Sequence, residues 1–571
     1  MDQIIKENYE KWLNSPMVSE DDKIKLKKMS SKDIDDSFFK EIAFGTAGLR
    51  GILGPGLNRM NLFTVKRATI GFGLYLKNHF KGDIYVAISH DNRYMSREFT
   101  LSTSQILNEM GINTYIFDSL RSTPELSFTV RFKKCQGGIM ITASHNPKEY
   151  NGYKIYDECG CQLVPSKIKE VIEIINNLGD PLLVKVPISN IKGKTNLVGE
   201  DVDYPYCKMV ESLEINKLNK KDFKIIFSPN HGTSYVNAMR IFNDLGYEII
   251  DVKELSNPDP EFSGLESPNP EDPRAFLIPI EVAKKEGAEL IVMTDPDGDR
   301  VGLASKDNNG TYNLMTGNES AALLLDYILM NKISLKEDLS KYIVYNTVVS
   351  SMIGKAICDY YSIRLESFLT GFKYIGNQIE HYKNIQNGYK FLFGYEESYG
   401  CLISDEVRDK DGTQAILLYS EMALYYHQLG MDLKTAYNNL CMKLKKYYKS
   451  QLFNIYFEGS EGQNKMNEIM YKIENDPFKE ILGNKVTIIE NYFKLDRIYL
   501  NDKKEEKIEN LPKGDLVKFF FEDGSNISIR PSGTEPKCKF YIEVTDDIAD
   551  EEKCLNKGEK YFEEIKKILK I

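Results

Sequence analysis

The fold class is decided by the stretch AELIVMTDPDGDR, at residues 288–300. It begins with a mostly apolar run, as expected for a strand buried in a sheet, and passes directly into a loop with three aspartates. The helical stretch EVAKKEG (281–287) precedes it, and the β-rich run FKIIFSP (223–229) begins the same unit. Strand, helix and strand in this order are typical of an α/β layer with a mostly parallel sheet.

The same alternation continues on both sides of this unit. Upstream lie the β-rich runs IYVAI (84–88) and GGIMIT (137–142), with a helical stretch between them. Downstream, KYIVYNTVV (341–349) and RLESFLT (364–370) repeat the pattern. The sequence therefore predicts a series of α/β units, and the first forty residues are predicted to form helices.

Three of the predicted strands run straight into loops rich in Gly, Asp, Ser or Glu. These loops are TASHNP (142–147), DPDGDR (295–300) and GYEESYG (394–400). In open α/β sheets, ligand sites lie at the carboxyl ends of the strands. We therefore expect the chemistry of the protein in these loops.

The last part of the chain has a different character. Residues 515–544 contain a D-G turn between β-rich runs, which predicts antiparallel strands, and a helical tail follows. Charged, Asn-rich sequence around 445–475 is interpreted as helical and as the boundary before this region. The length of 571 residues fits three or four domains of about 150 residues each. The expected domains are residues 1–205, 206–312, 313–448 and 449–571.

The charge balance excludes two classes of partner. With 74 Lys+Arg against 84 Asp+Glu, the net charge is −10, whereas nucleic acid or an anionic membrane requires a basic surface. Small anionic substrates remain open, because they need only a local positive pocket. The charged N-terminus, the lack of a long apolar run and nine scattered cysteines predict a cytoplasmic protein with reduced thiols.

The loop DPDGDR places Asp295, Asp297 and Asp299 at alternate positions. Converging carboxylates repel one another unless a cation lies among them, and oxygen ligands without His or Cys favour Mg²⁺. An EF-hand loop is excluded, because its sixth and twelfth positions are Arg300 and Lys306 rather than Gly and Glu. The alternative is a solvent-exposed acidic turn. In the metal interpretation, Arg300 is placed to meet an anionic group beside the cation.

The loop TASHNPKEYNGYK (142–154) offers a candidate nucleophile, Ser144, with His145 beside it and Lys154 further along. A serine hydroxyl is a poor nucleophile unless a base or a metal assists it. The alternative is an ordinary turn with a hydrogen-bonding serine.

The segment RPSGTEPK (530–537) has the groups that bind phosphate. Hydroxyls, exposed backbone N–H groups and a guanidinium fork suit phosphate geometry, although the loop lacks the Walker pattern. The alternative is an ordinary hairpin loop with a basic residue. The residues concerned are Arg530, Ser532, Gly533, Thr534 and Lys537.

Four shorter motifs add polar groups. FGTAGLRG (44–51) ends in Arg50, and TGFKY (370–374) begins with Thr370 and Gly371. Glu396 and Ser398 of GYEESYG suit the hydroxyls of a sugar ring, and Lys410 of RDKDG (408–412) suits proton transfer. A nucleophile, a cation site, a phosphate site and a sugar site together predict phosphoryl transfer on a phosphorylated sugar.

These motifs, in this order, closely resemble those of the α-D-phosphohexomutase family of phosphoglucomutases and phosphomannomutases. The resemblance extends from FGTAGLRG to RPSGTEPK. The residues within the motifs are most similar to those of the branch of bacterial phosphoglucomutases and phosphoglucomutase-2-like proteins. It implies three related α/β domains with mixed sheets and a C-terminal α+β domain around a central cleft.

The resemblance also implies a role for each matching residue. Ser144 carries a phosphoryl group and, with the three aspartates, binds one Mg²⁺ per chain. Lys410 is the general acid and base. The other matches are Arg50, Lys154 and Arg300 around the reacting phosphate; Thr370, Gly371, Glu396 and Ser398 at the sugar; and Arg530, Ser532, Gly533 and Thr534 at the distal phosphate. Lys539 falls where many members have an arginine.

The implied reaction interconverts glucose 1-phosphate and glucose 6-phosphate through glucose 1,6-bisphosphate, which is both intermediate and activator. Gly400, where some phosphomannomutases have a histidine, favours glucose as the sugar. The alternatives on this scaffold are a phosphomannomutase, a phosphopentomutase and a glucose-1,6-bisphosphate synthase. Outside it, they are a sugar-phosphate phosphatase and a regulatory binding protein. We expect a monomer, with a dimer as the alternative.

Overall fold

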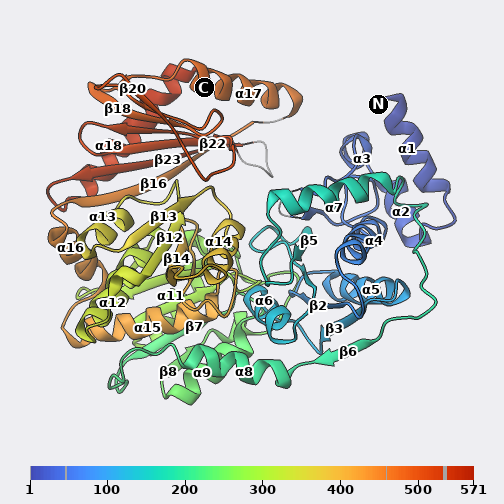
Figure 1. Cartoon of the computed structure of the whole chain (residues 1–571), viewed down its shortest axis with the longest axis horizontal. Coiled ribbons are helices and arrows are strands. Elements are labelled where there is room, and N and C mark those ends of the chain that lie inside the picture. Colours follow the sequence, from blue (N-terminus) through green and yellow to red (C-terminus); the bar gives the residue numbers. More distant parts are fainter. Residues whose placement is uncertain (1, 46–47, 458, 532–536) are drawn as a thin grey trace. The chain divides into compact units, whose positions relative to one another are not determined.

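The structure is a computed structural model that describes residues 2–45, 48–457, 459–531 and 537–571 (Figure 1). The chain forms two compact units. Unit 1 comprises Met1–Thr316, Phe372–Gly394 and Ser398–Gln428. Unit 2 comprises Gly317–Gly371, Tyr395–Glu397 and Leu429–Ile571.

Unit 1 begins with the three predicted helices, α1 (Gln3–Asn14), α2 (Glu20–Lys28) and α3 (Ser31–Phe38). Each begins after a side chain that accepts a hydrogen bond from the backbone of the first turn, which is the usual N-cap arrangement. The helices share a small core that includes Trp12 and Phe38.

The first sheet of unit 1 has six strands in the order β1-β5-β4-β2-β3-β6. Its middle strands are parallel, whereas β5 runs antiparallel to β4 and β1. Helices α4, α5 and α7 share the core of one face, and α6 packs on the other face (Figure 1). The bounds are β1 Leu49–Ile52, α4 Leu62–His79, β2 Tyr85–His90, α5 Ser96–Glu109, β3 Asn113–Phe117, α6 Thr123–Phe132, β4 Gly137–Ile141, β5 Tyr150–Tyr156, α7 Pro165–Asn177 and β6 Thr195–Val198.

The second sheet of unit 1 has the order β11-β10-β9-β7-β8. Strands β7 and β9 are parallel, as predicted, β8 pairs in parallel with β7, and β10 and β11 add an antiparallel edge. Helix α11 packs against β7 and β9, and α15 packs against β9 and β10. The bounds are α8 Glu200–Glu211, β7 Lys224–Ser228, α9 Tyr235–Leu245, β8 Glu248–Asp251, α10 Lys253–Ser256, α11 Leu277–Glu286, β9 Leu290–Thr294, β10 Val301–Lys306, β11 Tyr312–Met315 and α15 Gly412–Gln428.

The third predicted α/β segment is divided between the units. In unit 2, strands β12 and β13 pair in parallel, and α13 connects them as the sequence predicts. Helix α12 packs against α13 and α16. The bounds are α12 Gly317–Ser334, β12 Tyr342–Thr347, α13 Ile353–Tyr361, β13 Arg364–Phe368, α14 Lys373–Lys383, β14 Lys390–Glu396, β15 Gly400–Leu402 and α16 Leu433–Lys443.

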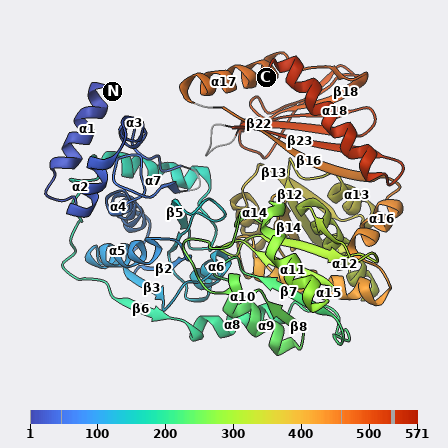
Figure 2. The same ribbon diagram turned by 180° about the vertical axis from the view of Figure 1, so that it is seen from behind.

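Unit 2 ends in an antiparallel sheet with the order β16-β23-β22-β21-β18-β19-β20, and β17 pairs with β18. The predicted D-G turn joins β21 to β22, with Gly524 at φ +86°. Helix α18 packs against β23 and β16 (Figure 2). The bounds are β16 Tyr447–Tyr456, α17 Gly459–Asn475, β17 Glu480–Ile481, β18 Asn484–Asn491, β19 Asp496–Tyr499, β20 Lys504–Lys507, β21 Val517–Phe521, β22 Asn526–Pro531, β23 Lys537–Asp546 and α18 Glu551–Leu569.

The helical interpretation of residues 445–475 is partly wrong. Among the described residues of this range, α17 is the helix, because β16 pairs with β23 along its whole length, from Tyr447 with Asp546 to Tyr456 with Lys537. The run YYKSQLFNIY is rich in aromatic and β-branched residues, and the pairing with a distant strand decides its conformation. In the described part of the chain, no helix is long and apolar enough to cross a membrane.

Candidate active site

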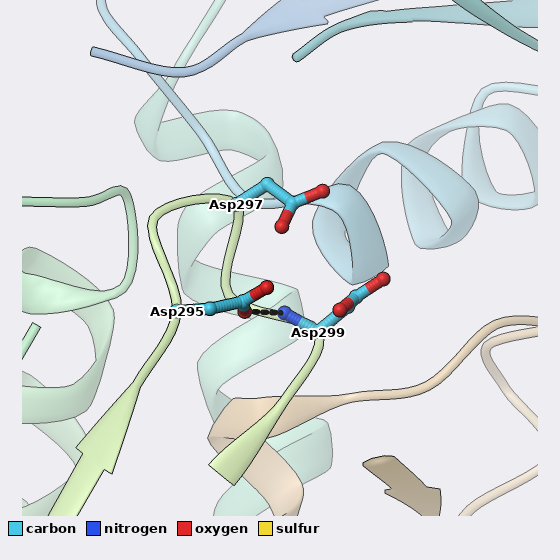
Figure 3. A group of neighbouring side chains, drawn as sticks. All are labelled: Asp295, Asp297 and Asp299. Carbon is cyan, nitrogen blue, oxygen red and sulfur yellow. Dashed lines mark hydrogen bonds between the residues drawn. The ribbon is translucent and has the colours of Figure 1, made fainter. Parts of the chain in front are cut away.

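The acidic loop after β9 folds around Asp295. One oxygen of its carboxylate, Oδ1, accepts a hydrogen bond from the backbone N–H of Asp299 at 3.0 Å (Figure 3). It accepts another from the backbone N–H of Arg300, also at 3.0 Å. Asp295, Asp297 and Asp299 each offer an oxygen atom within 4.8 Å of the others. Their exposed fractions are 0%, 0% and 4%. The alternative of a solvent-exposed acidic turn is therefore excluded.

Burial and charge act differently on two of these carboxyl groups. Burial raises the pKa of Asp295 well above its usual range, and the charges of Asp297 and Asp299 add to the increase. Burial favours the neutral form of Asp297 as well. However, the Lys154 ammonium, 2.8 Å from Asp297 Oδ2, and nearby hydrogen bonds outweigh it, so the pKa of Asp297 lies below its usual range.

The carboxylates retain capacity for a cation. The Oδ1 atoms of Asp297 and Asp299 are buried and have no hydrogen-bond partner among the described residues. A buried carboxylate oxygen without a partner is costly unless a cation or water satisfies it. The all-oxygen donor set therefore fits a hard divalent cation such as Mg²⁺.

Ser144 lies in the loop between β4 and β5 and faces this cluster. Its Oγ donates a hydrogen bond to Asp295 Oδ2 at 2.7 Å and lies 3.2 Å from His145 Nδ1. Its backbone is left-handed, with φ at +53°, and its N–H donates to Thr142 Oγ1 at 2.8 Å. The hydroxyl of Ser144 thus lies against a carboxylate of the candidate metal site, as a metal-assisted nucleophile requires.

Two of the basic side chains expected near the reacting phosphate lie beside these loops. Arg50, in β1, donates from Nη1 to the side-chain oxygen of Asn146 at 3.1 Å, and burial lowers the pKa of its guanidinium. Arg300 donates from Nη1 to the Glu271 carboxylate, and its Nε lies 3.9 Å from Asp299 Oδ1. The expected contact of these residues with a phosphate stays a prediction.

Lys410 reaches the same cluster from the segment before α15. Its Nζ lies 3.3 Å from Asp299 Oδ2 and 3.6 Å from Asp409 Oδ1. The Asp409 carboxylate also accepts a hydrogen bond from Tyr156 Oη at 3.0 Å, which fixes it beside the lysine. Unit 1 thus brings together a hydroxyl, a cluster of carboxylates and several cations, an arrangement suited to phosphoryl transfer.

The residues expected at the sugar are divided between the units. In unit 2, the backbone N–H of Gly371, at φ +124°, donates to Glu396 Oε1 at 2.8 Å. Thr370 is the preceding residue and is half-buried. Ser398 belongs to unit 1.

Of the residues expected at the distal phosphate, Arg530 and Lys539 are cross-strand partners in β22 and β23. Their side chains therefore lie on the same face of the sheet. Ser532, Gly533 and Thr534 lie outside the described residues.

The residue that holds the Ser144 loop lies outside the sequence motifs described above. Arg93 donates to four backbone carbonyls of this loop. A signal was present, because HDNR (90–93) is another polar motif at the end of a predicted strand, β2. Asn146, the partner of Arg50, lies within a quoted motif, but only the fold brings it to the arginine.

Four family models match the chain in order. They describe the α/β/α domains I, II and III and the C-terminal domain of phosphoglucomutase/phosphomannomutase. The matched residues are 41–181, 204–310, 316–444 and 491–555.

Two curated relatives are similar over nearly the whole chain. A phosphoglucomutase of Staphylococcus epidermidis (strain RP62A) is 36% identical over 524 residues, covering 91% of this chain and 94% of the relative. A phosphoglucomutase of Staphylococcus aureus (strain RF122) is 37% identical over 522 residues, covering 90% and 92%.

Two solved structures are similar in fold. One is a phosphoglucomutase/phosphomannomutase family protein of Burkholderia thailandensis, with a TM-score of 0.65, 17% identity and coverage of 94% of this chain and 98% of that one. The other is the open form of the Paramecium phosphoprotein parafusin, with a TM-score of 0.64, 20% identity and coverage of 92% and 95%.

Proposed function

Because the chain belongs to the phosphoglucomutase/phosphomannomutase family, we infer that it is a phosphoglucomutase, an isomerase that interconverts glucose 1-phosphate and glucose 6-phosphate. The observation that carries this inference is the hydroxyl of Ser144, 2.7 Å from a buried carboxylate of the candidate metal site. A buried serine beside a cation site suits a covalent phosphoryl carrier, and it supports the mutase over a regulatory binding protein.

In the proposed reaction, Ser144 Oγ carries a phosphoryl group in the resting enzyme. The 6-hydroxyl of glucose 1-phosphate attacks the phosphorus, the bond to Ser144 Oγ breaks, and Lys410 is the candidate that takes the hydroxyl proton. The bound product of this step is glucose 1,6-bisphosphate. The bisphosphate turns over within the site, and Ser144 Oγ then attacks the phosphorus at position 1. The bond from that phosphorus to the sugar oxygen breaks, the sugar oxygen takes the proton that Lys410 held, and glucose 6-phosphate leaves with the phosphoserine restored.

The chain's own residues meet the electrostatic demands of this reaction. Arg50, Lys154 and Arg300 are the candidates that balance the charge of the transferring group. Asp295, Asp297, Asp299 and the oxygen on Ser144 are the proposed ligands of one Mg²⁺ ion, which supplies further charge neutralisation when bound. Burial of Ser144, which is 3% exposed, keeps water from the reacting oxygen.

The sugar hydroxyls and the second phosphate of the substrate are proposed to be bound by the motifs that do not take part in phosphoryl transfer. Thr370, Gly371, Glu396 and Ser398 are proposed to bind the sugar hydroxyls. Arg530, Ser532, Gly533, Thr534 and Lys539 are proposed to bind the phosphate that is not transferred. The four domains are proposed as residues 1–205, 206–312, 313–448 and 449–571.

We place this enzyme in the cytoplasm as a monomer. All nine cysteines are free in the structure, which suits a reducing compartment. The excess of acidic residues also suits a small-molecule substrate better than nucleic acid or an anionic membrane.

A coupled assay tests the function. Purified protein with Mg²⁺ and trace glucose 1,6-bisphosphate should convert glucose 1-phosphate to glucose 6-phosphate, faster than it converts mannose 1-phosphate or ribose 1-phosphate. Turnover should stop in Ser144→Ala and when Mg²⁺ is chelated. Faster turnover of another sugar would move the assignment to the corresponding mutase. Release of inorganic phosphate from the sugar phosphate that survives in Ser144→Ala would support the phosphatase.

A further inference from the structure

Arg93 lies against the backbone of the loop that carries Ser144. Its side chain is 0% exposed. Nη1 donates to the carbonyl oxygens of Pro147 and Tyr150, at 2.7 Å and 3.1 Å. Nη2 donates to the carbonyl oxygens of Ser144 and Asn146. One guanidinium thus binds four carbonyls between Ser144 and the start of β5.

The rest of the guanidinium is also in contact with its surroundings. Its Nε lies 3.2 Å from Asp91 Oδ2, and its central carbon lies 5.1 Å from the centre of the Phe262 ring. Asp91 is held in turn by a hydrogen bond from Ser96 Oγ at 2.7 Å. The planar fork of Arg93 is therefore fixed in one orientation, which a flexible ammonium could not reproduce.

The loop needs such support because its key residue has an uncommon backbone conformation. Ser144 has φ at +53°. Residues other than glycine rarely adopt this backbone conformation, and they keep it only where the surrounding structure imposes it. Its backbone N–H donates to Thr142 Oγ1, and its carbonyl oxygen accepts a hydrogen bond from Arg93 Nη2. Together they hold the residue from both sides.

We propose that Arg93 is a positioning residue for phosphoryl transfer. Its guanidinium holds the carbonyls of residues 144–150 and so keeps Ser144 Oγ at 2.7 Å from Asp295 Oδ2. The identity of the reaction rests on the proposed function, whereas the role of Arg93 in positioning the loop rests on the contacts of its guanidinium alone. Arg93 touches neither of the reacting atoms and acts through the backbone of Ser144.

The variant Arg93→Lys tests this role. Lysine keeps the positive charge, but its three N–H groups cannot reach four carbonyls in one plane. We expect kcat to fall about 10²-fold, the cost of a small misplacement at a reacting centre. KM for glucose 1-phosphate should change little, because the proposed sugar-binding residues are untouched. The matched control is Arg97→Lys, since Arg97 lies in α5 and donates to a single carbonyl, that of Phe117.

Hydrogen–deuterium exchange gives a readout that does not depend on activity. The amides of residues 143–150 should exchange faster in Arg93→Lys than in the wild type or in Arg97→Lys. If Arg93→Lys fails to fold, Phe262→Leu removes the ring beside the guanidinium and should give the same change, at smaller amplitude. Exchange and kcat equal to those of Arg97→Lys would overturn the proposal. The protein could also lack mutase activity while hydrogen exchange in the loop still increases in Arg93→Lys. That result would support the positioning role and refute the proposed function.

Discussion

At the scale of single residues, Gly400 explains why Lys410 can reach the candidate metal site. A Cβ added at Gly400 would lie 2.0 Å from Lys410 Cδ and 2.9 Å from its Cε. The lysine would have to move, although its Nζ now lies 3.3 Å from Asp299 Oδ2. The absence of a side chain at this position is therefore part of the proposed catalytic arrangement.

We accordingly expect Gly400→Ala to lower kcat by about 10- to 100-fold through displacement of Lys410. The control is Gly430→Ala. Gly430 has φ at +74° with no atom within 4 Å of an added Cβ, so alanine there strains the backbone without touching the site. The control should lose some thermal stability and keep its kcat. A Gly400→Ala enzyme with wild-type kcat would show that Lys410 does not need its present position.

The residue scale also marks the limit of prediction from sequence. Asp295, Asp297 and Asp299 could be predicted as one site. Three aspartates at alternate positions directly after an apolar strand place their carboxylates close together at the end of that strand. Arg93 could not be linked to Ser144 in this way. Its contacts are with backbone carbonyls, which every residue has, so no side-chain pattern identifies the partner.

At the scale of elements, strands β7 and β9 were predictable, because buried parallel strands are mostly apolar runs. Strands β10 and β16 were not, since the pairing of each depends on a partner and on context outside its own sequence. The helical interpretation around β16 was wrong for this reason. Loops at the carboxyl ends of the predicted strands nevertheless located most of the candidate site.

An ion pair between two elements of unit 1 gives a test at this scale. Arg121, before α6, donates to the two oxygens of Asp203 in α8, at 2.9 Å and 2.7 Å. Both side chains are buried, with 8% and 6% exposed. Removing one partner leaves the other charge buried and unpaired, so we expect Arg121→Met to reduce the free energy of unfolding by about 3–5 kcal/mol.

The matched control for Arg121→Met is Arg240→Met. Arg240 also binds both oxygens of a carboxylate, Glu200, at 2.9 Å and 2.6 Å, but this pair is partly open to solvent, with 32% and 67% exposed. An exposed pair contributes about 1 kcal/mol or less. Urea unfolding of both variants measures the difference. Equal losses would mean that burial does not decide the strength of these pairs.

At the scale of the whole molecule, the two units differ in their chemistry. Unit 1 holds the candidate nucleophile, the candidate metal ligands and Lys410, which are proposed to transfer the phosphoryl group. Unit 2 holds Glu396, Arg530 and Lys539, which are proposed to recognise the rest of the substrate. The order of motifs along the chain predicted four domains, but it could not predict which residues belong to the same compact unit.

The central claim is that Ser144 carries the transferred phosphoryl group. The most direct measurement is the mass of the peptide that contains Ser144, after incubation of the protein with Mg²⁺ and glucose 1,6-bisphosphate. We predict that this peptide gains one phosphoryl group at Ser144 and loses it when glucose 1-phosphate or glucose 6-phosphate is added in excess. A phosphoryl group found on an aspartate, or a Ser144 that stays unmodified while the protein turns substrate over, would contradict the account.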